Sequence, residues 1–326
     1  MDFVLFLLIF LAFHNSGQLL SNKIFGLKFP DPGEAVLFST ALGSIVFSGI
    51  ITVFVFSGWI NSAICWSILV VFLVLGWKNL LHFTKLSNIF NSPISQPAED
   101  SGIRNLTQSF LGLLVLLSIG SAFAPAFAND ALVYHLAVPK AFLQTGGLVD
   151  LPNNIYSLFP QQIEMLYLFA LALGSDSLAQ LTGLGIVFLL LFALWQYSKK
   201  NIHKNYAWLT PLIFISTPTF FSVASYAYVE LQATAYVFLA FYSWKNGCDQ
   251  KQPDWFFLMT LFTGAAIATK LTTVIILPLA FLGLALHGRT CKNLKQTISQ
   301  CLILIFGSLL IPVSYTHLTL PTKRIV

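Results

Sequence analysis

The chain has 326 residues, of which 56% are hydrophobic and only 9% are charged. Soluble domains carry about 25% charged residues, so this composition excludes a soluble globular protein. The net charge is +5 and the mean hydropathy is +0.79. Because basic residues of such a chain lie in loops between membrane spans, we interpret the charge as a topology signal and not as the sign of a nucleic-acid partner.

Apolar runs of about 20 residues recur along the sequence, and each is long enough to cross a hydrocarbon core about 30 Å thick as a helix. The alternating pattern of an outer-membrane barrel is not found. We therefore expect an all-α polytopic integral membrane protein with about ten transmembrane helices. The expected spans are Phe3 to Leu20, Ala35 to Phe56, Ile60 to Leu81, Ser109 to Phe127, Leu178 to Tyr197, Ala207 to Ala224, Val229 to Trp244, Trp255 to Thr269, Leu271 to Leu286 and Ile298 to Val313.

Short loops rich in Lys and Arg stay on the inner side of a membrane. Between Lys23 and Lys295, this rule places every basic residue inside except Lys140 and Lys270, provided that the segment 161–174 does not cross. A helix of that length spans only about 21 Å, and it carries Glu164. We therefore expect an amphipathic, interfacial helix there, within a long outer loop that runs from Asn129 to about Asp176.

The stretch "NDALVYHLAVPK" opens this outer loop. If Asn129 caps a short helix, Asp130 and Tyr134 lie one turn apart on the same face, until Pro139 disrupts the helix. Asp130 is also consistent with an acid that merely stabilises a helix N-terminus. Tyr134 and His135 can bind a polar ligand or a phosphate, although a single histidine at a membrane interface is more often structural.

Three further charged residues lie on the expected outer side. Lys140 is a candidate phosphate ligand, but a lysine there can also extend to lipid headgroups. Glu230 follows the aromatic loop "SYAY" at the start of a span, where it can act in catalysis or cap the helix. Lys270 interrupts an apolar stretch of about 48 Å, which is too long for one crossing. It lies either at the tip of a hairpin or in one kinked helix, and in both cases an ammonium at membrane depth needs an anion.

Four segments occur in an order that resembles a known family. They are "NDALVYHLAVPKAFLQTGGL", "SLFPQQIEMLYLFALALGSDSLAQL", "SYAYVELQATAYVFLAFYSW" and "LFTGAAIATKLTTVIILP". Over about residues 107 to 313 the chain resembles GT-C class membrane glycosyltransferases of the glycosyltransferase family 39 type. That branch includes protein mannosyltransferases and the bacterial transferases that modify lipid A and lipopolysaccharide.

This resemblance implies an inverting transfer of a sugar from a polyprenyl-phosphate carrier to a glycolipid, glycan or protein acceptor on the outer face of a bacterial inner membrane. The first-loop acid of the family corresponds to Asp130, the acid of its second outer loop to Glu230, and its lysine to Lys270. The usual pair of acids reads Asn129-Asp130 here, so no metal and no other cofactor is expected.

The chemistry of this reaction agrees with the charged residues. Transfer from a phosphate leaving group needs a carboxylate that takes the proton of the acceptor hydroxyl and cations that hold the departing phosphate. We expect Asp130 to be the base and Lys270 to bind the phosphate, with Glu230 orienting the acceptor. Tyr134, His135, Lys140 and Glu164 are the remaining candidates for contacts with sugar or phosphate, and the helix around Glu164 would form the floor of the cavity.

Three parts of the chain are expected. Residues 1–106 form a three-span region whose role the sequence does not give, and residues 107–313 form the catalytic region. Residues 314–326, "SYTHLTLPTKRIV", are interpreted as a non-native read-through tail. Two other classes remain open. One is a transporter or flippase, although its polar residues would lie near the bilayer midplane. The other is a membrane scaffold without catalysis.

Overall fold

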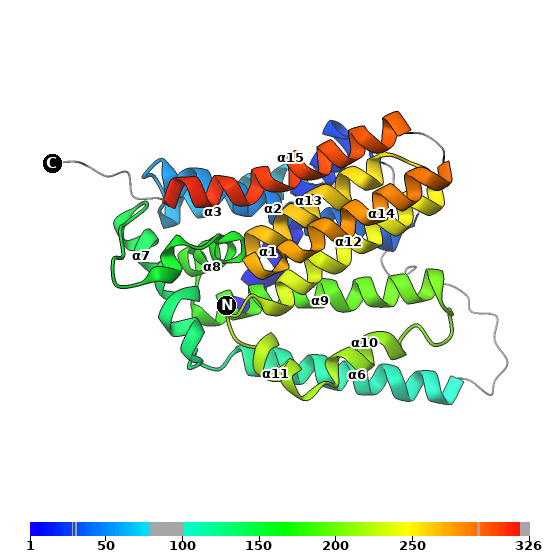
Figure 1. Ribbon diagram of the computed structural model, residues 1–326. Coiled ribbons are helices and arrows are strands. Elements are labelled where there is room, and N and C mark those ends of the chain that lie inside the picture. Colours follow the sequence, from blue (N-terminus) through cyan, green and yellow to red (C-terminus); the bar gives the residue numbers. More distant parts are fainter. Residues whose placement is uncertain (28, 30, 78–100, 292–293, 320–326) are drawn as a thin grey trace.

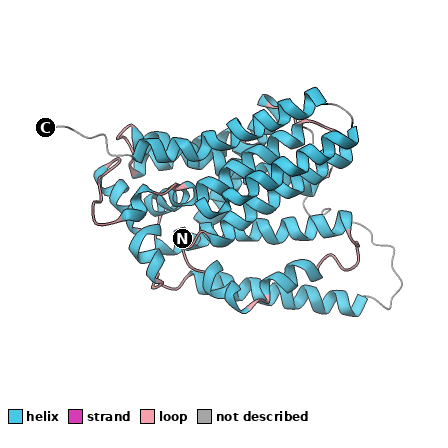
Figure 2. Ribbon diagram, in the orientation of Figure 1, coloured by secondary structure: helices cyan, strands magenta, loops and turns pink. Residues whose placement is uncertain are grey.

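The computed structural model describes residues 1–27, 29, 31–77, 101–291 and 294–319. Within these ranges the chain forms helices joined by short loops and contains no strand (Figure 2). The expected all-α polytopic membrane fold is thereby confirmed. The basic residues Lys28, Lys78, Lys85 and Lys292, expected on the inner side, fall outside the described residues.

The first helices pack closely because small residues lie between them. α1 (Asp2–Leu19) continues into a π-helical turn, Leu20–Ile24, and packs along α2 (Pro32–Phe56). A Cβ atom on Gly17 would lie only 1.7 Å from the backbone oxygen of Ser39. α3 (Ser62–Leu75) begins at Asn61, whose side chain accepts a hydrogen bond from the backbone amide of Ile64. The expected span ran from Ile60 to Leu81, and its last four residues, 78–81, lie outside the described residues.

The outer loop that we expected between two spans contains most of the irregular structure. α6 (Ser101–Ala122) precedes it, and the loop contains a π-helical turn (Ala131–His135), α7 (Ala137–Thr145), a 3-10 turn (Ile155–Leu158) and α8 (Gln162–Leu173). α9 (Asp176–Asn201) follows, with Ser175 as its N-cap. The first helix of this loop breaks at Leu136, and Pro139 is accommodated in the first turn of α7.

α8 is too short to span a membrane, as expected, but it differs from the amphipathic helix that the sequence predicted. Every residue of α8 except Leu171 is buried. The helix packs against α2, α7 and α9, so protein surrounds it on all sides. Apolar residues pack equally well against lipid and against other helices, and a short apolar run therefore does not reveal which it meets.

The expected span from Ala207 to Ala224 is not a single helix. The chain forms α10 (Leu209–Ile215) and α11 (Pro218–Ala224), each of seven residues. The break precedes Pro218, which lacks an amide hydrogen and disfavours helical geometry at the residue before it. The hydroxyls of Ser216 and Thr217 donate to backbone carbonyls of α10 at 2.7 and 2.9 Å. The prediction of one crossing helix was therefore wrong here.

The C-terminal half is a bundle of four long helices, α12 (Glu230–Gln250), α13 (Asp254–Thr269), α14 (Ile276–Cys291) and α15 (Leu294–Thr319). α13 ends at Lys270, whose backbone is extended (φ −151°, ψ 118°), and a 3-10 turn, Leu271–Ile275, then leads into α14. α14 runs back along the bundle (Figure 1). The hairpin, and not a kinked single helix, is thus the structure around Lys270. α15 continues past Val313 to Thr319, so the expected tail begins inside a helix.

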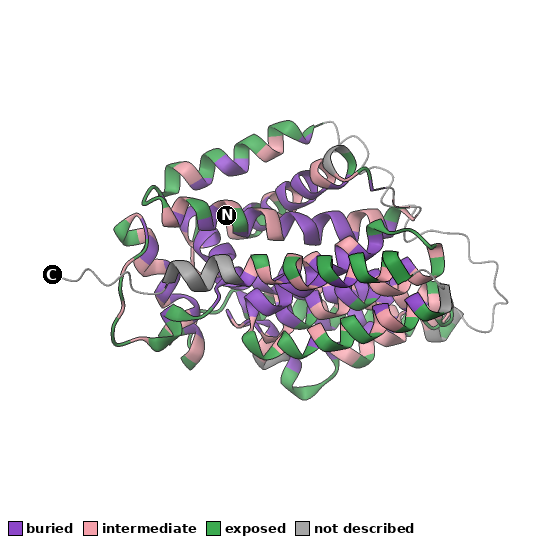
Figure 3. Ribbon diagram, turned by 45° about the horizontal axis from the view of Figure 1, so that its top comes forward, coloured by how far each residue is buried: buried purple, intermediate pink, exposed green. Residues whose placement is uncertain are grey.

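Buried residues gather in the interior of the bundle (Figure 3). The helices α6, α14 and α15 expose apolar side chains. Among the described residues, six helices are long and apolar enough to cross a membrane, and the expected number of ten is not confirmed. Exposed Leu279, Phe306 and Leu310 are side chains that a lipid environment accommodates and water does not. The chain is therefore an integral membrane protein.

Candidate functional site

Asp130 and Tyr134 form the first part of the site. The hydroxyl of Tyr134 donates a hydrogen bond to Oδ2 of Asp130 at 3.2 Å, and both side chains are half-buried. The two residues lie one turn apart, as their spacing predicted. The other carboxylate oxygen of Asp130 forms no hydrogen bond with Tyr134, so this carboxylate can still accept a proton from a substrate.

Aromatic rings extend the site from Tyr134 toward the surface. The ring of Tyr156 stacks on that of Tyr134, with centroids 4.3 Å apart and an interplanar angle of 17°. Phe159 meets Tyr156 edge to face at 5.6 Å. Tyr156 was not among the candidates from the sequence, because a tyrosine 22 positions away in an irregular loop gives no signal of this contact.

His135 and Glu164 form a buried pair beneath Tyr134. Nδ1 of His135 lies 2.8 Å from Oε1 of Glu164, and the two side chains are 2% and 7% exposed. Both were candidates for direct contacts with sugar or phosphate. Because both are buried and bonded to each other, their contact links the π-helical turn Ala131–His135 to α8, and neither side chain is open to a ligand in this structure.

Glu230 and Lys270 form the charged part of the site. Nζ of Lys270 donates to Oε1 of Glu230 at 2.5 Å, and both side chains are more than a third exposed. Oε2 of Glu230 accepts a hydrogen bond from the backbone amide of Val229 at 3.2 Å. The N-terminus of α12 and the C-terminus of α13 thus bring two residues 40 positions apart into contact, and the lysine meets the anion that its position requires.

Tyr228 connects the two parts. The backbone of Asp130 hydrogen-bonds the Tyr228 hydroxyl, and burial together with the carboxylates of Asp130 and Glu230 raises the pKa of this hydroxyl. The backbone carbonyl of Tyr228 in turn accepts a hydrogen bond from the hydroxyl of Tyr167 on α8. Tyr228 therefore lies near both Asp130 and Glu230, and it was not among the candidates from the sequence.

The Tyr134 hydroxyl is also affected by the charges of both parts of the site. Burial and the carboxylate of Asp130 raise the pKa of the Tyr134 hydroxyl above its usual range. The carboxylates of Glu230 and Glu164 contribute to this rise, so three acids from separate elements act on one hydroxyl. Burial and nearby negative charge both disfavour the ionised phenol. Tyr134 therefore stays a hydrogen-bond donor at neutral pH.

Lys140 lies apart from these residues. Its ammonium donates to Asp176 at the start of α9 at 2.8 Å, and the two side chains are 41% and 36% exposed. The structure therefore unites six of the seven sequence candidates and gives Lys140 another partner. No group of three or more His, Cys, Asp or Glu side chains arranged to hold a metal ion occurs among the described residues.

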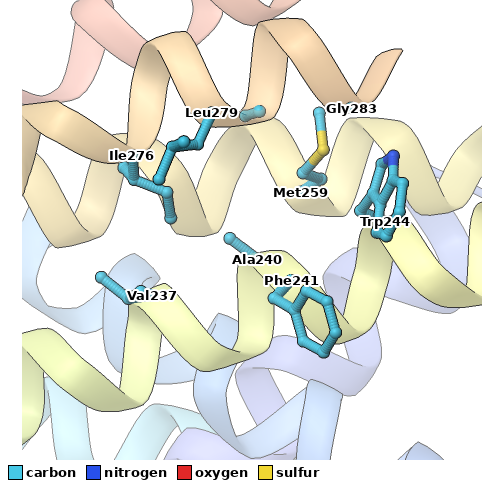
Figure 4. Close-up of a pocket in the computed structure, with 9 residues that line it drawn as sticks. Val237, Ala240, Phe241, Trp244, Met259, Ile276, Leu279 and Gly283 are labelled. Atoms are coloured by element: carbon cyan, nitrogen blue, oxygen red, sulfur yellow. The ribbon is translucent and has the colours of Figure 1, made fainter. Parts of the chain in front are cut away.

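An apolar cavity of about 250 Å³ lies between α12, α13 and α14 (Figure 4). α12 begins at Glu230 and α14 follows Lys270. The nearest lining residues, Val237 and Ile276, lie about 10 Å along the chain from Glu230 and Lys270. At the far end, a Cβ on Gly283 would lie 2.9 Å from Nε1 of Trp244, so the close approach of α14 requires glycine. The lining residues are Val237, Ala240, Phe241, Trp244, Met259, Ile276, Leu279, Ala280 and Gly283.

The fold and this site define a polytopic helical membrane protein with acids, a lysine and aromatic residues gathered at one end of its bundle. Residues 165–315 match the family described as dolichyl-phosphate-mannose-protein mannosyltransferase. Over these residues the chain is similar to membrane glycosyltransferases of the GT-C type. The match includes Glu230 and Lys270, whereas Asp130, His135 and Glu164 precede it. No curated protein and no solved structure matches the chain.

Proposed function

We propose that the protein transfers a sugar from a polyprenyl-phosphate donor to an acceptor hydroxyl on the outer face of a bacterial inner membrane, with inversion at the anomeric carbon. The observation that supports this most strongly is the juxtaposition of Asp130 with the Glu230–Lys270 pair through Tyr228. It supports a site in which Asp130 would accept a proton and Lys270 would bind the phosphate. The acceptor is a glycolipid, a glycan or a protein.

The reaction is a single displacement. Asp130 accepts the proton of the acceptor hydroxyl as its oxygen forms a bond to the anomeric carbon. The bond from that carbon to the phosphate oxygen breaks with its electron pair, and polyprenyl phosphate leaves. The ammonium of Lys270 stabilises the departing negative charge, which it does more strongly near hydrocarbon than in water. Glu230 keeps Lys270 oriented before the donor enters and orients the acceptor afterwards.

The apolar cavity supports a lipid-linked donor. It starts two turns below the Glu230–Lys270 pair and is lined by apolar side chains (Figure 4). A donor whose phosphate meets Lys270 would place its isoprenoid chain along this surface, where burial of apolar area contributes about 25 cal/mol per Å². The phosphate of such a donor would thus contact the charged pair, and its isoprenoid chain would contact the apolar cavity next to it.

The test is sugar release from a panel of labelled polyprenyl-phosphate sugars by membranes that contain the protein. We expect release with at least one donor, and a loss of about 100-fold or more in Asp130→Asn, because a positioned base contributes about that much. Asp249→Asn is the matched control, since Asp249 pairs with Lys245 at the other end of α12. If the folded native protein releases no sugar from any donor, or if Asp130→Asn releases it at the native rate, the proposal is wrong.

A further inference from the structure

The His135–Glu164 pair is more buried than the Glu230–Lys270 pair of the site. Its side chains are 2% and 7% exposed, whereas those of Lys270 and Glu230 are 36% and 39% exposed. A hydrogen bond in a region that excludes water is stronger than one at the surface, because no solvent competes for it. The contact is therefore suited to fixing two elements relative to each other.

The two elements are the π-helical turn that follows Asp130 and the buried helix α8. In this turn the amide of Leu136 donates to the carbonyl of Ala131, five residues back, at 2.9 Å. π turns occur often at functional sites, where the additional residue redirects a side chain. Here two adjacent residues meet different partners, because Tyr134 bonds to Asp130 while His135 bonds to Glu164.

The second polar atom of each side chain forms no hydrogen bond with the described residues. Nε2 of His135 and Oε2 of Glu164 are buried and find no hydrogen-bond partner within the described part of the chain. Leaving buried polar atoms unpaired costs stability, and native proteins retain such an arrangement chiefly where it serves a function. A single bond of 2.8 Å therefore carries the polar attachment of the turn to α8.

We propose that His135 and Glu164 are positioning residues, which hold the turn bearing Asp130 and Tyr134 against α8 and so set the reach of Asp130 toward the acceptor hydroxyl. This inference rests on the proposed glycosyl transfer. A misplacement of a reacting group by about 1 Å costs about 100-fold in rate, so a modest shift of this turn suffices to suppress transfer. Neither side chain touches the substrate.

The test compares Glu164→Leu, which removes the acceptor oxygen at similar volume, with Glu164→Gln, which keeps an acceptor oxygen at the same place. Per folded molecule, we expect Glu164→Leu to lower turnover at least tenfold with a donor KM within twofold of native. Glu164→Gln should restore turnover to within threefold. A side chain that only stabilises the fold would change the folded fraction and leave the turnover of folded molecules intact.

Hydrogen exchange supplies a readout that does not depend on activity. We expect the amides of residues 130–136 to exchange faster in Glu164→Leu than in Glu164→Gln, with those of α9 as an internal reference. Should Glu164→Leu yield no folded protein, His135→Asn weakens the same bond with a smaller change and is measured in the same way.

Native turnover of folded Glu164→Leu, or unchanged exchange at residues 130–136, would overturn the inference. If exchange responds as expected while even the native protein transfers no sugar, the attachment of the turn is established and the proposed function is the part that fails.

Discussion

Lys270 and Glu230 hold opposite charges 2.5 Å apart, so a donor phosphate has to compete with a carboxylate for the same ammonium. This contact makes opposite predictions for its two members. Lys270→Met should weaken the binding of polyprenyl phosphate about tenfold or more, because a charged hydrogen bond contributes about 1.5–3 kcal/mol. Glu230→Gln should bind it at least as tightly as the native protein, since the lysine is released.

The measurement is equilibrium binding of polyprenyl phosphate to the purified variants in detergent. Transfer should fall in both variants, because Glu230 is proposed to orient the acceptor. Equal weakening of binding in both variants would show that the pair acts as a structural unit and that Lys270 does not receive the phosphate.

Tyr134 combines a hydrogen bond and a ring contact, and these can be separated. Tyr134→Phe removes the bond to Asp130 but keeps the ring that stacks on Tyr156. The net value of such a bond is about 1 kcal/mol, so we expect turnover to fall about fivefold. Tyr134→Leu should fall further, because the stacked pair is also lost. Steady-state rates of the two variants measure the difference, and equal rates would assign no role to the ring.

The spacing of residues predicted local contacts of the site but not its long-range ones. Asp130 and Tyr134 are four residues apart, and helical geometry alone places them together. The contact of His135 with Glu164, 29 positions away, depends on how α8 packs. The hydroxyl of Tyr228 likewise reaches Asp130 across almost 100 positions. Contacts between residues so far apart in the chain depend on how the helices pack, and residue spacing does not predict them.

At the scale of elements, α12 is attached to its neighbours at both ends. Its first residue bonds to Lys270, and near its other end Tyr242 donates to Oε1 of Glu34 at 2.8 Å. Lys200 of α9 donates to the same oxygen at 2.6 Å, and Asn246 at 3.1 Å. Glu34 is 1% exposed, so this network joins α2, α9 and α12 in the interior.

Glu34→Ala should therefore destabilise the protein by about 2–4 kcal/mol, because it leaves a lysine, a phenol and an amide without their shared acceptor. Thermal unfolding in detergent should show a clear decrease in Tm. Asp249→Ala removes an ion pair near the same end of α12 whose side chains are 32% and 41% exposed, and it should change stability by less than about 1 kcal/mol. A smaller effect for Glu34→Ala than for Asp249→Ala would contradict this account.

Length decided which elements the sequence predicted well. The stretch from Trp255 to Leu286 is too long for one straight crossing, so the sequence predicted either a hairpin or a kinked helix at Lys270, and the structure has the hairpin. The break before Pro218 was missed because membrane helices tolerate proline when neighbours satisfy the freed backbone groups. The burial of α8 was missed for a different reason. A helix rich in leucine has the same composition whether its surface faces lipid or protein.

For the whole molecule, the N-terminal helices pack directly against the helices that carry the candidate site. The hydroxyl of Ser44 in α2 lies 2.8 Å from that of Tyr236 in α12, and Ser48 donates to the carbonyl of Gln162 in α8 at 2.6 Å. α1 also packs against α9. Helices α1 and α2, which belong to the region for which the sequence gave no role, therefore support the helices that carry Glu164 and Glu230, and we interpret these two helices as the scaffold of the site.

This interpretation predicts that residues 107–326 do not fold alone. Without α1 and α2, Tyr236 and Tyr242 lose their hydroxyl and carboxylate partners, and the apolar faces of α8 and α9 lose the helices that cover them. Unpaired buried polar groups cost about 1–3 kcal/mol each, and native stability is only about 5–15 kcal/mol. Size-exclusion chromatography in detergent should show aggregation of the fragment. Because the lost contacts are non-covalent, co-expression of the fragment with residues 1–106 should restore a monodisperse complex. A stable fragment with the Tm of the intact chain would instead mean that the two regions fold independently.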